Sequence, residues 1–370
     1  MQRSIEPSFW RGKRVLVTGH TGFKGAWLCL LLHRMGASVY GLSLAAETPS
    51  LYAQARIAEL LSGETVGDIE DAGVVAGAVN AASPDIVFHL AAQSLVRRAY
   101  REPVRTFATN VIGTANVLEA LRSSEGLKAV FVTTTDKVYM NLETGARFSE
   151  HDHLGGHEPY GASKAAAEMV VSAYNASYFA PKGVPLLTAR AGNVVGGGDW
   201  SQDRILPDMI RAMMAGEAVR VRNPQATRPW QLVLDALEGY LLLVEKFCGA
   251  EAPKLDPHAM AWNFGPSHDA DMVSVEQLCR WAQESWPDRF RWTVIPDPNA
   301  TPESGLLHLD SRRAMSELGW KPRLSAREAV LKALDWYLRT LAGEDPREVS
   351  LGQMGRRFPQ IAAAQGLHAV

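Results

Sequence analysis

A tyrosine and a lysine four residues apart, Tyr160 and Lys164, form the pair with the clearest chemical use. Residues at this spacing in a helix lie on one face, so the phenol and the ammonium would be neighbours. A nearby cation stabilises a phenolate, and a tyrosine with an ordinary pKa of about 10 can then act as a base near neutral pH. The pair alone is a weak signal, because it often occurs on helix surfaces.

The segment before this pair makes the signal much stronger. The run Thr133-Thr134-Thr135-Asp136-Lys137 ends a predicted strand, Ala129–Thr133. Its hydroxyl, carboxyl and ammonium groups can bond a substrate or exchange protons with it. A strand that ends in this way, followed by the helix of Tyr160 and Lys164, indicates an active site.

Three glycines, Gly19, Gly22 and Gly25, have GxxGxxG spacing between a predicted strand and a predicted helix. Glycine lets the backbone turn sharply and approach a pyrophosphate, and a helix that begins near Gly22 offers free N–H groups to that anion. Because Lys24 precedes the last glycine, the turn is not a Walker A loop. The motif predicts a dinucleotide site, and the alternative is a tight turn without a ligand.

The segment after the second predicted strand bears on the type of dinucleotide. Leu42–Ala46 is neutral, so the usual acceptor of both ribose hydroxyls is missing, and no arginine follows at once to hold a 2′-phosphate. The balance favours NAD over NADP. Asp68 is placed to accept from the adenine amino group, although a surface aspartate fits the spacing equally well.

These residues require an α/β framework to position them. Short apolar runs alternate with longer helical segments, which is typical of βαβ units and of a parallel sheet covered on both faces. The predicted strands are Val15–Thr18, Ser38–Leu42, Glu64–Gly67, Ile86–Leu90, Ala129–Thr133 and Pro185–Arg190, and the predicted helices among them are Gly25–Met35, Pro103–Ser123 and Tyr160–Ala176. The sequence predicts a Rossmann-type doubly wound parallel sheet with a smaller mixed C-terminal lobe.

A change in composition after Arg190 predicts a domain transition. Three consecutive glycines and a series of prolines follow, and helices are expected at Leu206–Ala215, Trp230–Phe247, Ser274–Ser285 and Ala326–Ala342. We expect a dinucleotide-binding domain over residues 10–190, with later segments able to complete its sheet. A substrate-binding lobe would span 191–342, and a flexible tail 343–370.

Composition excludes several classes of protein. The 370 residues are 46% hydrophobic and 21% charged with a net charge of −2, which is typical of a globular protein and predicts no nucleic-acid or membrane partner. The three cysteines lack CxxC spacing and fit a reducing compartment. The first residues do not resemble a secretory signal, and Ala26–Leu32 is far shorter than the roughly 20 residues that span a bilayer. We therefore expect a cytoplasmic protein.

A group of histidines raises the question of a metal. His151, His153 and His157 lie with Asp152 in a predicted loop without an HExxH frame. The expectation is a solvated loop and no metal site.

Together with His89-Leu90-Ala91-Ala92-Gln93 and Asn110, these motifs resemble the extended short-chain dehydrogenase/reductase family over most of residues 10–340. Within it, the segment 135–139 resembles that of sugar-nucleotide 4,6-dehydratases, where an acid and a second proton-transfer residue follow a threonine or serine. Many dehydratases have Asp-Glu there, whereas Asp136-Lys137 is similar to the CDP-D-glucose 4,6-dehydratase subgroup. Residues 19–25, 190–200, 222–224, 228–230 and 262–266 share this similarity.

The resemblance implies an NAD-dependent hydro-lyase. Tyr160 would remove the proton of the C4 hydroxyl as hydride passes to NAD, while Thr135 bonds the same oxygen and Lys164 keeps the phenol acidic. Asp136 would then be the acid at the C6 hydroxyl and Lys137 the base at C5. A lysine base needs a pKa well below its ordinary 10.4, and the alternative is that Lys137 only steadies an enolate. Hydride returns to C6, so NAD is regenerated in each turnover.

The resemblance also implies which residues bind ligands. The cofactor residues are Gly19, Thr21, Gly22, Phe23, Lys24, Gly25, Asp68, Ile69, Leu90, Ala91, Ala92, Gln93, Thr109, Thr133, Tyr160 and Lys164. The substrate residues are Ser94 near the hexose, with Asn193, Arg204, Arg228, Asn263 and His308. The expected partners are a nucleotide-sugar, CDP-D-glucose by resemblance, and further copies of the chain in a homodimer or homotetramer. The reaction would serve deoxysugar and polysaccharide synthesis.

Two alternatives compete with this interpretation. A nucleotide-sugar 4-epimerase would not need the pair Asp136-Lys137. A non-catalytic dinucleotide-binding regulator could keep the glycines but would not need Tyr160 and Lys164.

Overall fold

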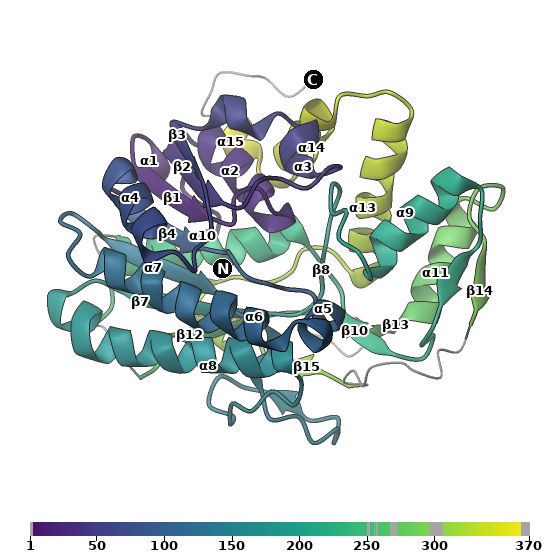
Figure 1. Ribbon diagram of the computed structural model, residues 1–370. Helices are drawn as coiled ribbons and strands as arrows, with labels where there is room; N and C mark the ends of the chain where they lie inside the picture. The colour runs from purple at the N-terminus through teal and green to yellow at the C-terminus, as the bar shows by residue number, and fades with distance from the viewer. Residues whose placement is uncertain are drawn as a thin grey trace.

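The central sheet has seven parallel strands in the order β12-β7-β5-β4-β1-β2-β3 (Figure 1). The computed structural model describes residues 3–249, 252–254, 256, 258–266, 272–295 and 306–363. The strand order changes direction between β1 and β4, and such a switch point leaves a crevice at the carboxyl ends of the strands. The strands are β1 (Arg14–Thr18), β2 (Ser38–Ser43), β3 (Gly63–Val66), β4 (Ile86–His89), β5 (Ala129–Thr133), β7 (Leu186–Ala191) and β12 (Ala261–Phe264).

Helices cover both faces of this sheet, as the apolar strands require. On one face lie α2 (Phe23–Arg34) and α10 (Val233–Cys248), and on the other lie α4 (Ala72–Ala82), α7 (Gly113–Leu121) and α8 (Pro159–Tyr174). The fold class predicted from the sequence is confirmed. No helix in the described ranges is both long and apolar enough to cross a membrane.

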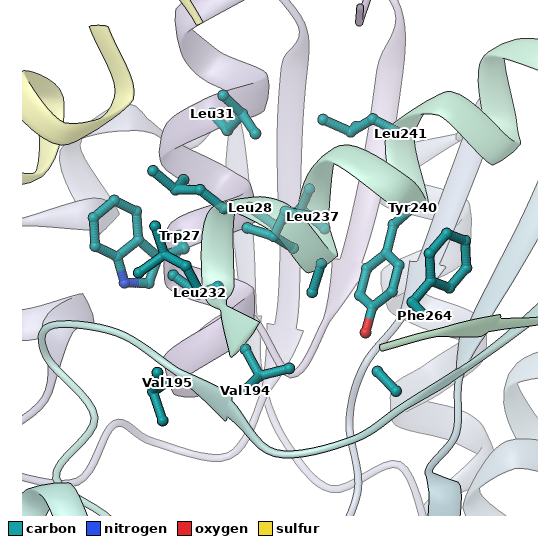
Figure 2. Packing of buried hydrophobic residues seen from close by; sticks show 14 of the residues in the cluster. Trp27, Leu28, Leu31, Val194, Val195, Leu232, Leu237, Tyr240, Leu241 and Phe264 are labelled. Atoms are coloured by element: carbon teal, nitrogen blue, oxygen red, sulfur yellow. The ribbon is translucent and has the colours of Figure 1, made fainter. Parts of the chain in front are cut away.

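The larger hydrophobic core lies on the face covered by α2 and α10. Figure 2 shows Leu28 and Leu31 of α2 close to Leu237 and Leu241 of α10, all of them buried. The same core continues to Phe264 at the sheet edge. Helix α10 is therefore part of the dinucleotide-binding unit, although it lies beyond residue 191 in the chain.

The second half of the chain supplies the lobe beside the crevice. Its two-stranded pairs are β8 with β11, β9 with β14, and β10 with β13. These strands are β8 (Val194–Val195), β9 (Val219–Val221), β10 (Thr227–Pro229), β11 (Gln231–Leu232), β13 (Met272–Ser274) and β14 (Trp292–Val294); the helices are α9 (Ile205–Ala215), α11 (Val275–Ser285), α12 (Arg312–Leu318) and α13 (Ala326–Leu341). Because α10 and β12 return to the sheet, residue 191 does not separate two contiguous units.

Two predicted helices differ in detail from the observed ones. The segment predicted as one helix over Pro103–Ser123 consists of α6 (Pro103–Phe107), a π-helical turn and α7. The π turn carries Asn110, whose buried amide bonds the backbone of Gln93. The helix predicted from Trp230 begins at Val233, because the preceding residues pair with β8.

The flexible tail predicted for residues 343–370 is wrong for the part that the structure describes. Residues Pro346–Arg357 form α14 and Pro359–Ala363 form α15, with Val349 and Phe358 buried. Arg357 donates hydrogen bonds to Asp235 and Glu238 of α10. The buried carboxylates of α10 thus hold this segment against the rest of the chain.

Candidate active site

A cavity of about 670 Å³ lies among the carboxyl ends of the sheet strands and the lobe, which is within the range of ligand pockets. Every residue predicted to bind the cofactor and every predicted catalytic residue lines it. Its lining contains ten lysines and arginines and six acidic residues, so its charge favours an anionic ligand.

The glycine turn joins β1 to α2 and needs glycine for steric reasons. Gly19 has φ +74°, and a Cβ there would lie 2.7 Å from the backbone N of Ala91. A Cβ on Gly25 would lie 2.1 Å from the carbonyl oxygen of Gly19. The N-cap of α2 is Gly22, which leaves the first N–H groups of the helix without a side-chain cap. This cradle fits the pyrophosphate of a dinucleotide.

The ends of β2 and β3 extend the same half of the cavity. Asp68 lines the cavity, and its carboxylate accepts a hydrogen bond of 3.0 Å from the backbone N–H of Glu70. Thr21 bonds the hydroxyl of Ser43 at 2.8 Å, which fastens the glycine turn to the end of β2. Glu47 also lines the cavity, and the sequence interpretation missed it because it considered only residues 42–46. An acid four residues after β2 was the available signal.

The first turn of α8 carries Tyr160, and Lys164 follows one turn later. The helix begins at Pro159, and the side chain of Glu158 caps it by accepting from the backbone N–H groups of Tyr160 and Gly161, both at 2.7 Å. Lys164 is 3% exposed, and its ammonium donates a hydrogen bond of 2.9 Å to the carbonyl oxygen of Thr133. The helix and the end of β5 are thus joined at the site.

The residues after β5 form a short 3₁₀ turn, Asp136–Val138, capped by Thr135. The Thr135 hydroxyl donates to Oδ1 of Asp136 at 3.0 Å, and Nζ of Lys137 lies 3.7 Å from the same oxygen. Asp136 is 1% exposed, and its other oxygen, Oδ2, has no hydrogen-bond partner among the described residues. A buried acceptor without a partner at a cavity wall is suited to a ligand hydroxyl.

Burial dominates the electrostatics of this cluster. It raises the pKa of Tyr160 to about 12, although a hydrogen bond with Thr135 and the positive charge of Arg204 oppose the shift. Burial lowers the pKa of Lys164 to about 8 and, with help from Arg204, also lowers that of Lys24 to about 8. Burial therefore opposes deprotonation of the phenol, and the expected effect of Lys164 on Tyr160 stays a prediction.

Four of the six predicted substrate residues line the other half of the cavity, namely Ser94, Asn193, Arg204 and Arg228. Arg204 joins the two walls, because it donates to Asp199 at 3.0 Å and to the hydroxyl of Ser94 at 3.3 Å. Arg228 is 8% exposed and donates to the carbonyl oxygen of Thr227 at 2.8 Å. Arginine side chains in this half suit a diphosphate.

The structure does not bring Asn263 and His308 to the cavity. Asn263 is fully buried at the end of β12, accepts from the Tyr139 hydroxyl at 2.7 Å and donates to the Phe148 carbonyl at 2.8 Å. His308 lies in β15 (His308–Leu309), which pairs with β6 (Arg147–Phe148). Neither residue lines the cavity, so the assignment of these two side chains to the substrate stays a prediction.

Two further residues at this site were not predicted. Glu168 lies one turn beyond Lys164 on α8, and Arg190 lies on β7; both are nearly buried and bond each other. A glutamate four residues after Lys164 on the same helix face was a usable signal.

Comparison with known proteins places the chain in a family. The family model described as GDP-mannose 4,6 dehydratase matches residues 16–333. A CDP-glucose 4,6-dehydratase of Salmonella typhimurium is 41% identical over 347 residues, covering 92% of this chain and 95% of that protein.

Solved structures have the same fold. The epimerase Mth375 of Methanothermobacter thermautotrophicus superposes with a TM-score of 0.76 at 22% identity, covering 91% of this chain and 95% of its own. MoeE5 in complex with UDP-glucose and NAD has a TM-score of 0.71 at 25% identity, covering 88% of this chain and 99% of its own. The chain belongs to the GDP-mannose 4,6 dehydratase family, whose members have the extended short-chain dehydrogenase/reductase fold.

Proposed function

We propose that the protein is an NAD-dependent CDP-glucose 4,6-dehydratase, which converts CDP-D-glucose to CDP-4-dehydro-6-deoxy-D-glucose and water. The observation that carries this proposal is the pair Asp136-Lys137 beside Thr135 and Tyr160 in one cavity. The 41% identity to the Salmonella enzyme supports the same conclusion.

The dinucleotide half of the cavity fits NAD. The glycine turn would hold the pyrophosphate, Asp68 the adenine amino group and Glu47 the adenosine ribose. Lys164 would hold the nicotinamide ribose. When bound, NAD supplies the acceptor of hydride from C4 of the hexose and later the donor of that hydride to C6.

Tyr160 and Thr135 act on the C4 hydroxyl. The phenolate oxygen of Tyr160 takes the hydroxyl proton as C4 becomes a ketone, and Thr135 orients the C4 oxygen. Burial opposes deprotonation of Tyr160, so cations near the phenol must offset that effect. Arg204 is one such cation on the protein.

The pair Asp136-Lys137 removes water from the ketone. Lys137 takes the C5 proton, and the electrons of the broken C5–H bond form the C5–C6 double bond, while Asp136 gives its proton to the C6 hydroxyl, which leaves as water. Lys137 would return the proton to C5 when hydride is added at C6. A proton shifted from Lys137 to Asp136 would convert the ion pair into this base and acid with no change in net charge. A 4-epimerase has no step that uses such a pair.

A second copy of the chain fits the outer face of α6, α7 and α8, which lie together on one side of the molecule (Figure 1). Val104, Ile112 and Met169 of this face are 82%, 55% and 61% exposed. Burial of these side chains in a homo-oligomer would remove apolar surface from water.

Incubation with CDP-, dTDP- and GDP-glucose tests the proposed function. Only CDP-glucose should give the strong ultraviolet absorbance of a keto-deoxysugar in base, and deuterium placed at C4 should appear in the C6 methyl group. Absence of product from every nucleotide-sugar, or loss of the label, would reject the proposal.

A further inference from the structure

The catalytic turn, residues 135–138, is flanked by Thr134 and Tyr139, whose hydroxyls bond buried side chains. At one end, the Thr134 hydroxyl donates to Oε1 of Glu168 at 2.6 Å. At the other end, the Tyr139 hydroxyl accepts from Nη1 of Arg190 at 2.9 Å and donates to Asn263 at 2.7 Å. Thr134 and Tyr139 are 4% and 1% exposed, so water does not compete strongly for these bonds.

Glu168 and Arg190 are themselves paired. Nε of Arg190 donates to Oε1 and Oε2 of Glu168 at 2.8 Å and 3.0 Å, and Nη2 donates to Oε2 as well. The two residues come from α8 and β7, so the pair joins the helix of Tyr160 to the sheet. The guanidinium also lies over the Tyr139 ring, 4.9 Å from its centroid.

We propose that the Glu168–Arg190 pair positions the catalytic turn, through Thr134 at one end and Tyr139 at the other, and thereby sets the geometry of water loss. The proposal rests on the proposed dehydratase function. Asp136 and Lys137 lie between the two contacts, and proton transfer depends steeply on their placement. Asn263 belongs to this supporting network through Tyr139.

Glu168 has a second effect, on Lys164. Its negative charge raises the pKa of Lys164 and so opposes the lowering by burial. The titratable groups around Lys164 are Tyr160 and Glu168 on α8, Lys24 from α2 and His89 from β4, with the Thr133 carbonyl from β5. Glu168 is the acidic group among these, and its charge favours the protonated form of Lys164.

Isosteric variants of the two contacts test positioning. Thr134→Val and Tyr139→Phe remove one hydroxyl each, Thr134→Ser restores a hydroxyl, and Tyr240→Phe is a matched control because the buried Tyr240 hydroxyl has no hydrogen-bond partner in the described part of the chain. Excess enzyme is mixed with CDP-D-glucose and quenched, and the 4-dehydro sugar before water loss is separated from the product by mass.

Water loss should slow by about 10- to 100-fold in Thr134→Val and Tyr139→Phe, with accumulation of the undehydrated sugar. Thr134→Ser and Tyr240→Phe should stay within about threefold of the unaltered protein. A lower melting temperature with an unchanged rate of water loss in both test variants would overturn the proposal.

Glu168→Gln provides a readout that a purely structural role would not change. The amide keeps an oxygen for Thr134 but lacks the charge, so the alkaline limb of the turnover pH profile should move down by about one pH unit. An unmoved limb contradicts the charge effect.

Hydrogen exchange in the free protein separates this inference from the proposed function. Backbone amides of residues 134–140 should exchange faster in Thr134→Val than in Thr134→Ser. If the unaltered protein converts no nucleotide-sugar, the proposed function fails, while equal exchange in the two variants would still refute positioning by Glu168.

Discussion

Two nearly buried arginines bind carboxylates in different regions of this protein. Arg190 bonds Glu168 beneath the catalytic turn, whereas Arg357 of α14 bonds Asp235 and Glu238 of α10. Arg190 is 5% exposed and Arg357 is 8% exposed, so both arginines are similarly shielded from solvent. None of these five residues lines the cavity.

The two ion pairs differ in the other groups to which their carboxylates are bonded. Glu168 also accepts from Thr134 next to the reacting groups, whereas Asp235 and Glu238 attach the C-terminal helices to α10. Burial raises the pKa of Asp235 and Glu238, and Arg357 opposes that rise. A buried ion pair therefore does not reveal its role until its next contacts are known.

The largest expected effect on the rate comes from removing a reacting group itself, next to the region of Glu168 and Arg190. Tyr160→Phe should abolish C4 oxidation, with a loss of about 10³-fold or more, because no other group there accepts the hydroxyl proton. Asp136→Asn should still oxidise C4 but lose water about 10²- to 10⁴-fold more slowly. Single-turnover product analysis measures both, and full activity of the two variants would contradict the assignment.

The second region should respond in stability and not in chemistry. Arg357→Met leaves the buried Asp235 without its cation, and leaves Glu238 paired with the partly exposed Arg323. It should lower the free energy of unfolding by about 3–5 kcal/mol. Turnover measured well below the melting temperature should stay unchanged. A fall in turnover without unfolding would remove the distinction between the two regions.

The pH dependence of that loss has a definite sign. Carboxyls whose pKa is higher in the folded state bind more protons folded than unfolded, so stability falls as pH rises from their ordinary values towards the raised ones. The deficit of Arg357→Met, measured by urea unfolding, should therefore grow between about pH 4 and pH 8. A deficit independent of pH would argue against unpaired carboxylates as its cause.

An intermediate effect is expected at Lys164, whose pKa is influenced by the charge of Glu168. Because burial lowers the pKa of Lys164 to about 8, turnover should fall above that pH as the ammonium loses its proton. Lys164→Arg should remove this limb, since a guanidinium stays charged, while Arg357→Met should leave it in place. Loss of the limb in Arg357→Met would show coupling between the regions.

The smallest effect is expected at Arg323, which shares Glu238 with Arg357. Its guanidinium lies 2.8 Å from Oε1 of Glu238, but its side chain is 32% exposed. Arg323→Gln should therefore cost no more than about 1 kcal/mol, as measured by urea unfolding. A cost equal to that of Arg357→Met would mean that exposure does not govern these pairs.

Much of the fold and most of the residues that line the cavity could be predicted from local patterns. The sequence predicted every strand of the sheet up to β7 within one or two residues, because buried parallel strands are continuous apolar runs. The sequence allowed later segments to complete the sheet but did not identify β12, and it predicted the tail wrongly. Both have one cause, which is that contacts between distant segments leave no local pattern. Helix α14 looked polar, yet Arg357 reaches carboxylates on α10.

The amino-acid sequence by itself determined the glycine cradle, the Tyr160–Lys164 face and the run Thr135-Asp136-Lys137, because each lies within one strand, turn or helix whose geometry fixes its members. Tertiary structure alone decided that Arg204 joins both walls of the cavity, that Asn263 and His308 lie outside it, and that Glu168 and Arg190 support the turn. Those relations depend on the direction in which side chains from separate elements point, and only the packed core sets that direction.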